Sequence, residues 1–102
     1  MIHVIATITL VPETADRFVE LFKANIPTVR AEDGCIAYEL TRDVDTGIPI
    51  QVGPRDNVVT VVEAWESLDH LHAHLDTPHM KQYHADTDGM TAGASLQVLE
   101  PV

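Results

Sequence analysis

The chain has little cysteine, little positive charge and few aromatic side chains. Cys35 is the only cysteine, which excludes an internal disulfide and a thiolate-rich metal site. Six lysines and arginines stand against sixteen acids, and the formal net charge is −10 at pH 7. With no basic stripe to displace phosphate counterions, this balance argues against a nucleic-acid partner and disfavours an anionic membrane surface.

Several recognisable segments are also missing. The first eleven residues are too short and too alternating to form a signal peptide or a membrane span. No glycine-rich phosphate loop follows a strand, and no serine or cysteine elbow is visible. We therefore expect one cytoplasmic, soluble domain over residues 1–102, without a membrane partner.

What the chain does have is a regular succession of hydrophobic patterns. Hydrophobic residues make up 45% of the sequence, too many for a disordered protein. The patterns predict, in order, a strand at 2–11, a helix opened at 12–16 and ended at 33–34, strands at 35–43 and 58–66, a helix capped by Ser67 and restarted at Thr77-Pro78, and a strand at 94–99. This β-α-β-β-α-β order predicts an α+β, ferredoxin-like fold, with an antiparallel sheet and both helices on one face.

Apolar residues occupy both faces of the first and third strands, but two helices can cover only one face. We therefore predict a homodimer whose sheets pack face to face.

Three finer predictions follow. Ile36, Tyr38 and Leu40 should share one face of the second strand, and Pro27 should kink the first helix near residues 23–27. Residues 44–56, with two glycines and two prolines, form either a surface loop or a lid over a pocket.

The third strand delivers the only tryptophan, Trp65, to a histidine-dense helical segment. Trp65 shares a strand face with Val61 and Glu63, and five of the six histidines lie at positions 70–84. An aromatic platform beside groups that titrate near neutral pH suits a small aromatic substrate that must lose a proton. The alternative is that Trp65 is simply a core residue.

Two histidines are candidates for the base. His74 lies at the edge of the apolar stripe of its helix, where a side chain can look into a cavity, although it could instead bond to the backbone. His79 lies in the first turn of the restarted helix, where the helix dipole disfavours its protonation. Both are the expected catalytic residues, together with Trp65.

Other side chains are candidates for binding a metal ion or the substrate. His70 is expected to face water, and although His70 and His74 have the spacing of a helical two-histidine site, no third ligand accompanies them. We therefore predict no metal site. The side chains expected to contact a substrate, with core packing as the alternative for Met80 and Tyr83, are His3, Tyr38, Met80, Tyr83 and His84.

Longer stretches of the sequence carry a family resemblance. They are Ile26-Pro-Thr-Val29, Glu32-Asp-Gly-Cys35 with Tyr38, Glu63-Ala-Trp-Glu-Ser67, Ala73-His-Leu-Asp-Thr-Pro-His-Met-Lys81 and Leu99-Glu-Pro101. With this spacing, nearly the whole chain resembles the antibiotic biosynthesis monooxygenase superfamily, whose members are dimeric α/β barrels. The match is most similar to the quinol monooxygenase branch.

The resemblance implies oxygenation that needs no cofactor, whether flavin, haem or metal. A small hydroquinone or polyphenol would lose a proton, and its electron-rich anion would reduce dioxygen directly. In that scheme Trp65 stacks on or borders the ring, and His74 or His79 takes the proton. Tyr38 and Tyr83 would hydrogen-bond an oxygen of the substrate.

Two alternatives stay open beside this scheme. Val61 stands where anthrone-oxidising relatives have an asparagine, so the mechanism of those relatives does not transfer directly to this chain. One alternative is that the same fold serves as a non-catalytic ligand-binding or stress-related module. His84 falls near the position of the haem-ligating histidine in haem-degrading relatives, so haem degradation is a further alternative.

Overall fold

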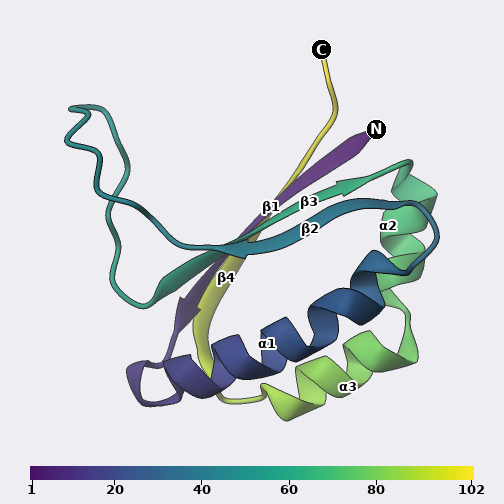
Figure 1. Cartoon of the computed structure of the whole chain (residues 1–102), viewed down its shortest axis with the longest axis horizontal. Helices are drawn as coiled ribbons and strands as arrows, with labels where there is room; N and C mark the ends of the chain where they lie inside the picture. Colours follow the sequence, from purple (N-terminus) through teal and green to yellow (C-terminus); the bar gives the residue numbers. More distant parts are fainter.

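The computed structural model describes all 102 residues as one sheet with three helices on one face (Figure 1). The elements are β1 (Ile2–Leu10), the 3₁₀ turn η1 (Pro12–Thr14), α1 (Ala15–Arg30), β2 (Cys35–Thr41), β3 (Val58–Trp65), α2 (Leu68–Leu75), α3 (Pro78–Asp86) and β4 (Thr91–Leu99). The sheet order is β2-β3-β1-β4, and every neighbouring pair is antiparallel. The predicted ferredoxin-like α+β fold is confirmed.

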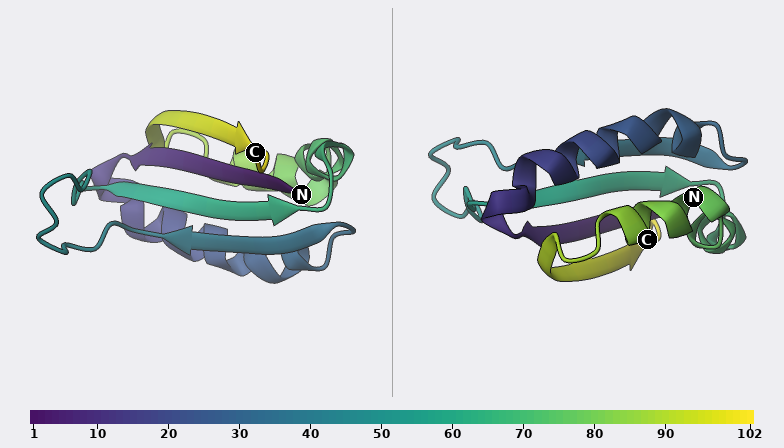
Figure 2. Two further views of the ribbon diagram at one scale, coloured as in Figure 1. Left: turned by 90° about the horizontal axis from the view of Figure 1, so that it is seen from above. Right: turned by 90° about the horizontal axis from the view of Figure 1, so that it is seen from below.

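The core lies between the sheet and the helices, which cover the same face in both views of Figure 2. The register pairs Val4 with Glu63 and Ala6 with Val61, so alternate residues of β1 and β3 point toward the helices. From α1, Phe22 stacks on Tyr38 of β2 with ring centroids 5.4 Å apart. The alternation in the sequence therefore correctly groups the residues of β1 and of β3 that share the buried face.

Two short helices follow β3 because each has its own N-terminal cap. The Ser67 side chain accepts a hydrogen bond from the backbone of His70, and the Thr77 side chain accepts one from the backbone of Met80. Pro78 occupies the first turn of α3, where its missing N–H costs nothing. The predicted restart at Thr77-Pro78 is confirmed, and it lets α2 and α3 take different directions (Figure 1).

In β2 the structure differs from the strand face that the sequence predicts. Ile36 is 53% exposed, whereas Tyr38 is buried. The register shifts between Cys35 and Ala37, so Ile36 is an extra residue that leaves the alternation. The prediction that Ile36 shares the face of Tyr38 is therefore wrong. The kink at Pro27 stays a prediction, and α1 continues through that residue.

The connection between β2 and β3 projects from the end of the sheet that lies away from α2 (Figure 1). Arg55 clamps its base, donating to the two carboxylate oxygens of Asp43 over 2.8 and 3.0 Å. Ile50 near the tip is 91% exposed. Within one chain the segment is a surface loop and does not cover the histidine-bearing helices. None of the helices is long and apolar enough to cross a bilayer.

Gly34 has φ +80°, and a methyl group there would overlap the imidazole ring of His70. His70 is thus half-buried over the turn, contrary to the prediction that it faces water, and its Nδ1 lies 2.6 Å from Ser67 Oγ.

We expect Gly34→Ala to destabilise the protein more than Gly89→Ala, a matched control. Gly89 has φ +79° but open space around it. Its substitution should therefore cost only the strain of holding alanine in a left-handed backbone conformation, about 1–2 kcal/mol. Gly34→Ala should cost about 1–3 kcal/mol more, because the His70 ring must move. Urea denaturation of the two variants measures the difference, and equal losses would contradict the overlap.

Candidate active site

A small apolar cavity lies between the sheet and the helices, on the side toward α2 and α3. Its volume is about 130 Å³. Its walls are mostly hydrophobic, and the residues are Ala6, Ile8, Phe22, Tyr38, Val61, Glu63, His74, Leu75, Met80, Tyr83, His84 and Leu96. Leu75, His84 and Leu96 are exposed, which places the opening between the two short helices and β4. An apolar cavity of roughly 150 Å³ accepts benzene, so this one suits a single aromatic ring.

His74 is the buried histidine in the wall of this cavity. It is 1% exposed, and its Nδ1 lies 2.8 Å from Oε2 of Glu32, in the turn after α1. An ionised carboxylate only accepts hydrogen bonds, so Nδ1 is the nitrogen that donates to Glu32. Nε2 makes no hydrogen bond within the protein, and in the neutral tautomer it is the nitrogen that can accept a proton.

Trp65 packs behind the cavity and does not line it. The indole is 0% exposed, and its Nε1 donates to Oε1 of Glu63 over 3.0 Å. Its ring lies against the His74 imidazole, with centroids 4.6 Å apart. Glu63 and His74 stand at the wall in its place, so contact between Trp65 and the substrate stays a prediction that the lining of this cavity does not support. Trp65 instead positions both of them.

Three polar atoms on residues of the cavity wall have no hydrogen-bond partner. They are Glu63 Oε2, His74 Nε2 and the Tyr38 hydroxyl. None of them is fully sealed from solvent, whereas both nitrogens of the His79 ring are sealed and unpaired. Burial raises the pKa of both Glu63 and Tyr38.

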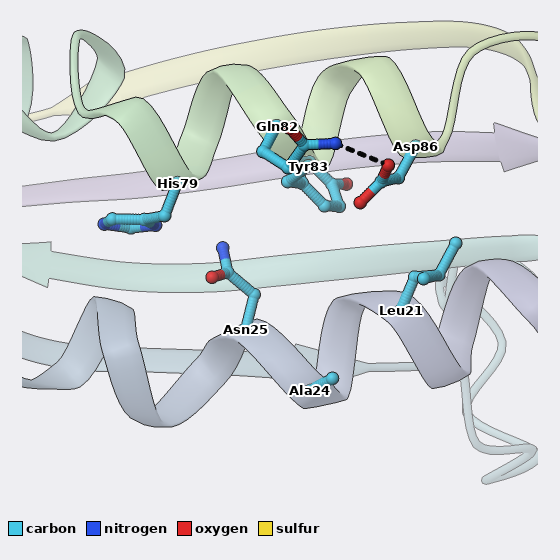
Figure 3. Close-up of a pocket in the computed structure, with 7 residues that line it drawn as sticks. All are labelled: Leu21, Ala24, Asn25, His79, Gln82, Tyr83 and Asp86. Carbon is cyan, nitrogen blue, oxygen red and sulfur yellow. Dashed lines mark hydrogen bonds between the residues drawn. The ribbon is translucent and has the colours of Figure 1, made fainter.

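His79 lies on the other side of Glu32. Its Nε2 is 3.1 Å from Glu32 Oε2, in a geometry that makes no hydrogen bond. His79 lines a separate groove of about 280 Å³ between α1 and α3, where it and Tyr83 face Asn25 (Figure 3). The two histidines predicted as bases therefore meet at one carboxylate, and only His74 reaches the cavity.

Most of the predicted binding residues gather at the cavity. Tyr38 and Met80 are buried in its wall, and Tyr83 and His84 line it with ring centroids 5.1 Å apart. Burial raises the pKa of Tyr83 to about 12, so its hydroxyl stays protonated at neutral pH.

His3 is the exception among them. It pairs with Ala64 and Leu99, which places it on the sheet face away from the helices. No group of three or more histidine, cysteine or acidic side chains is arranged to hold a metal ion.

Two residues of the site were missed as candidates, Glu32 and Glu63. The sequence could have identified Glu63, because it is the one carboxylate between Val61 and Trp65 on a strand face that is otherwise apolar. No sequence pattern identifies Glu32, because it contacts His74, 42 positions along the chain, only in the folded protein.

Comparisons with known proteins agree with this architecture. The family model for "Antibiotic biosynthesis monooxygenase" matches residues 1–86. The curated Escherichia coli K12 protein "Probable quinol monooxygenase YgiN" is 37% identical over 103 residues, covering 99% of this chain and 98% of the relative.

Solved structures give the same result. One from Caulobacter crescentus is 29% identical with a TM-score of 0.84, covering 99% of this chain and 89% of the other. Rv0793 from Mycobacterium tuberculosis is 26% identical with a TM-score of 0.82, covering 99% and 94%. Because the family model and the Escherichia coli relative both span most of its length, the chain belongs to the antibiotic biosynthesis monooxygenase family.

Proposed function

We propose that the protein is a quinol monooxygenase that oxidises a small hydroquinone or related polyphenol with dioxygen. Family membership and the Escherichia coli relative support monooxygenase-like activity. The observation that carries the finer proposal is the Glu32–His74 pair, in which His74 lines an apolar cavity of single-ring size and keeps its Nε2 without a partner. In such a dry site a neutral imidazole is a competent base for a phenol.

The proposed reaction begins when His74 Nε2 takes a hydroxyl proton from the bound hydroquinone. The resulting anion is electron-rich and reduces dioxygen directly, and the substrate supplies four electrons if one oxygen atom is inserted and two if none is. If oxygen adds at a ring C–H carbon, the products are a hydroxyquinone and one water. If no oxygen is inserted, they are the quinone and one hydrogen peroxide, and either outcome balances. The Tyr38 hydroxyl can donate a hydrogen bond to the anion, since burial keeps it protonated.

Oxygen uptake with benzene-1,4-diol, a hydroquinone of one ring that matches the size of the cavity, tests this proposal. Protein freed of metal and flavin should consume oxygen faster than the uncatalysed reaction, and peroxide measured in parallel separates the two outcomes. Uptake equal to the uncatalysed rate would remove the proposal.

The geometry gives the haem alternative no support. A porphyrin is several times larger than the single ring that the cavity can hold. His84, its candidate ligand, stands at the exposed mouth instead of deep in the cavity. The cytoplasmic location stays a prediction.

We also propose that two copies pair through the sheet faces that the helices leave bare. That face carries Ile5, Val62 and Leu99 among small and polar residues, and Val62 and Leu99 are 36% and 44% exposed.

Sedimentation at micromolar concentration should give twice the mass of one chain. The double variant Val62→Lys with Leu99→Lys, placing like charges in the interface, should give the mass of one chain. A wild-type monomer at that concentration would contradict the pairing.

A further inference from the structure

Oxidation of a hydroquinone releases two protons, and one base accounts for only one of them. The two hydroxyl groups of a para-hydroquinone lie at opposite ends of the ring, so a side chain that contacts one cannot contact the other. Both protons finally reside on reduced oxygen, as peroxide or water. A second acceptor near the ring would carry the second proton from the hydroxyl group to the reduced oxygen.

We infer that Glu63 is this second acceptor, taking the proton that His74 does not take. The inference rests on the proposed function and deepens it. Glu63 reaches the cavity from β3, on the sheet side, whereas His74 reaches it from α2, on the helix side. The two proton acceptors therefore lie on different walls of the cavity, on different sides of a bound ring.

The hydrogen bonds of Glu63 leave one oxygen for the substrate. Oε1 accepts from the Trp65 indole, which holds the carboxylate in place, and Oε2 has no partner and is not fully sealed from solvent. Glu63 is only 7% exposed. A buried acid with one anchored and one open oxygen costs stability, which is expected of a functional group.

Glu63 suits this part better than the other polar side chains in the wall. Tyr38 and Tyr83 have raised pKa values and act as donors, and His84 stands at the exposed mouth. Glu63 is the only carboxylate that lines the cavity.

Burial, a hydrogen bond and neighbouring charges shift the pKa of Glu63 in opposite directions. Burial raises its pKa most, and Glu32 in the turn after α1 adds to the rise. The Trp65 hydrogen bond and His74 lower it. From the other elements at the cavity, Tyr38 of β2 and Tyr83 of α3 line the same wall with neutral hydroxyls, and His84 of α3 stands at its exposed mouth. A carboxylate with a raised pKa is a stronger base than an ordinary one.

Glu63→Gln tests the inference with little change in shape, since the amide oxygen can still accept from Trp65. We expect kcat for hydroquinone oxidation to fall by about 10²-fold, with KM changed less than about threefold. On the acid side, log kcat of the wild type should fall with a slope of about two as both bases become protonated. The variant should show a slope of about one. Glu63→Asp should recover part of the rate.

Stability separates this role from a structural one. The folded-state pKa of Glu63 is raised, so its ionisation weakens the fold as pH rises from the unfolded-state pKa through the folded-state pKa. Glu63→Gln should therefore leave Tm at pH 7 unchanged or higher. Glu13→Gln, an exposed acid beyond β1, is the control and should change neither rate nor slope.

The outcomes are distinguishable. An active wild type with an unchanged rate and slope in Glu63→Gln would overturn the inference alone. A slower variant with a lower Tm and an acid slope still near two would assign Glu63 a structural role and also overturn it. No oxygen uptake by the wild type would remove the proposed function and this inference with it.

Discussion

His74→Ala should lower kcat for hydroquinone oxidation by about 10²–10⁴-fold, the usual contribution of a positioned general base. The reason is geometric, because His74 lines the cavity and keeps its Nε2 without a partner while Glu32 holds Nδ1. Steady-state oxygen uptake, with the substrate anion formation followed by absorbance, measures the loss.

His72→Ala is the matched control for this prediction. His72 lies on the same helix but is exposed to solvent, and it lines no part of the cavity. We expect its kcat within about twofold of wild type. His79→Ala should have a smaller effect than His74→Ala, because His79 acts only through Glu32. A His74→Ala protein that folds and retains the wild-type rate would contradict the assignment of the base.

Trp65→Phe should lower the free energy of unfolding by about 1–3 kcal/mol and should also slow the reaction. The substitution keeps an aromatic ring beside His74 but removes the N–H that Oε1 of Glu63 accepts. A buried carboxylate oxygen then loses its partner, and the cost is the desolvation that is no longer compensated. Urea denaturation of the two proteins at pH 7 measures the change.

A double-mutant cycle identifies the cause of that loss. In a Glu63→Gln background the acceptor is a neutral amide, so Trp65→Phe should cost at least about 0.5 kcal/mol less. An equal cost in both backgrounds would mean that the indole stabilises only by packing, and it would contradict the positioning role.

Local patterns in the sequence predicted the fold and one wall of the site. The two-residue period of strands β1 and β3 identifies the face that carries Val61, Glu63 and Trp65, and the Ser67 and Thr77 caps define α2 and α3. These features depend on neighbours a few positions away, so sequence alone contains them.

The remaining features depend on contacts between distant segments. Glu32 approaches His74 only because Gly34 turns the chain with positive φ and returns it to the sheet. The Thr77-Pro78 restart changes the direction of the helix, which sends His79 to the groove beside α1 instead of the cavity. His3 could have been excluded from the alternation of β1, which places it opposite Val4.

The most direct test of the central claim is an anaerobic crystal structure of the protein with a bound hydroquinone. The account predicts the ring inside the cavity, with one hydroxyl oxygen within hydrogen-bonding distance of His74 Nε2 and the ring separated from the Trp65 indole by Glu63 and His74. A ring bound in the groove beside His79, or on the surface away from His74, would contradict it.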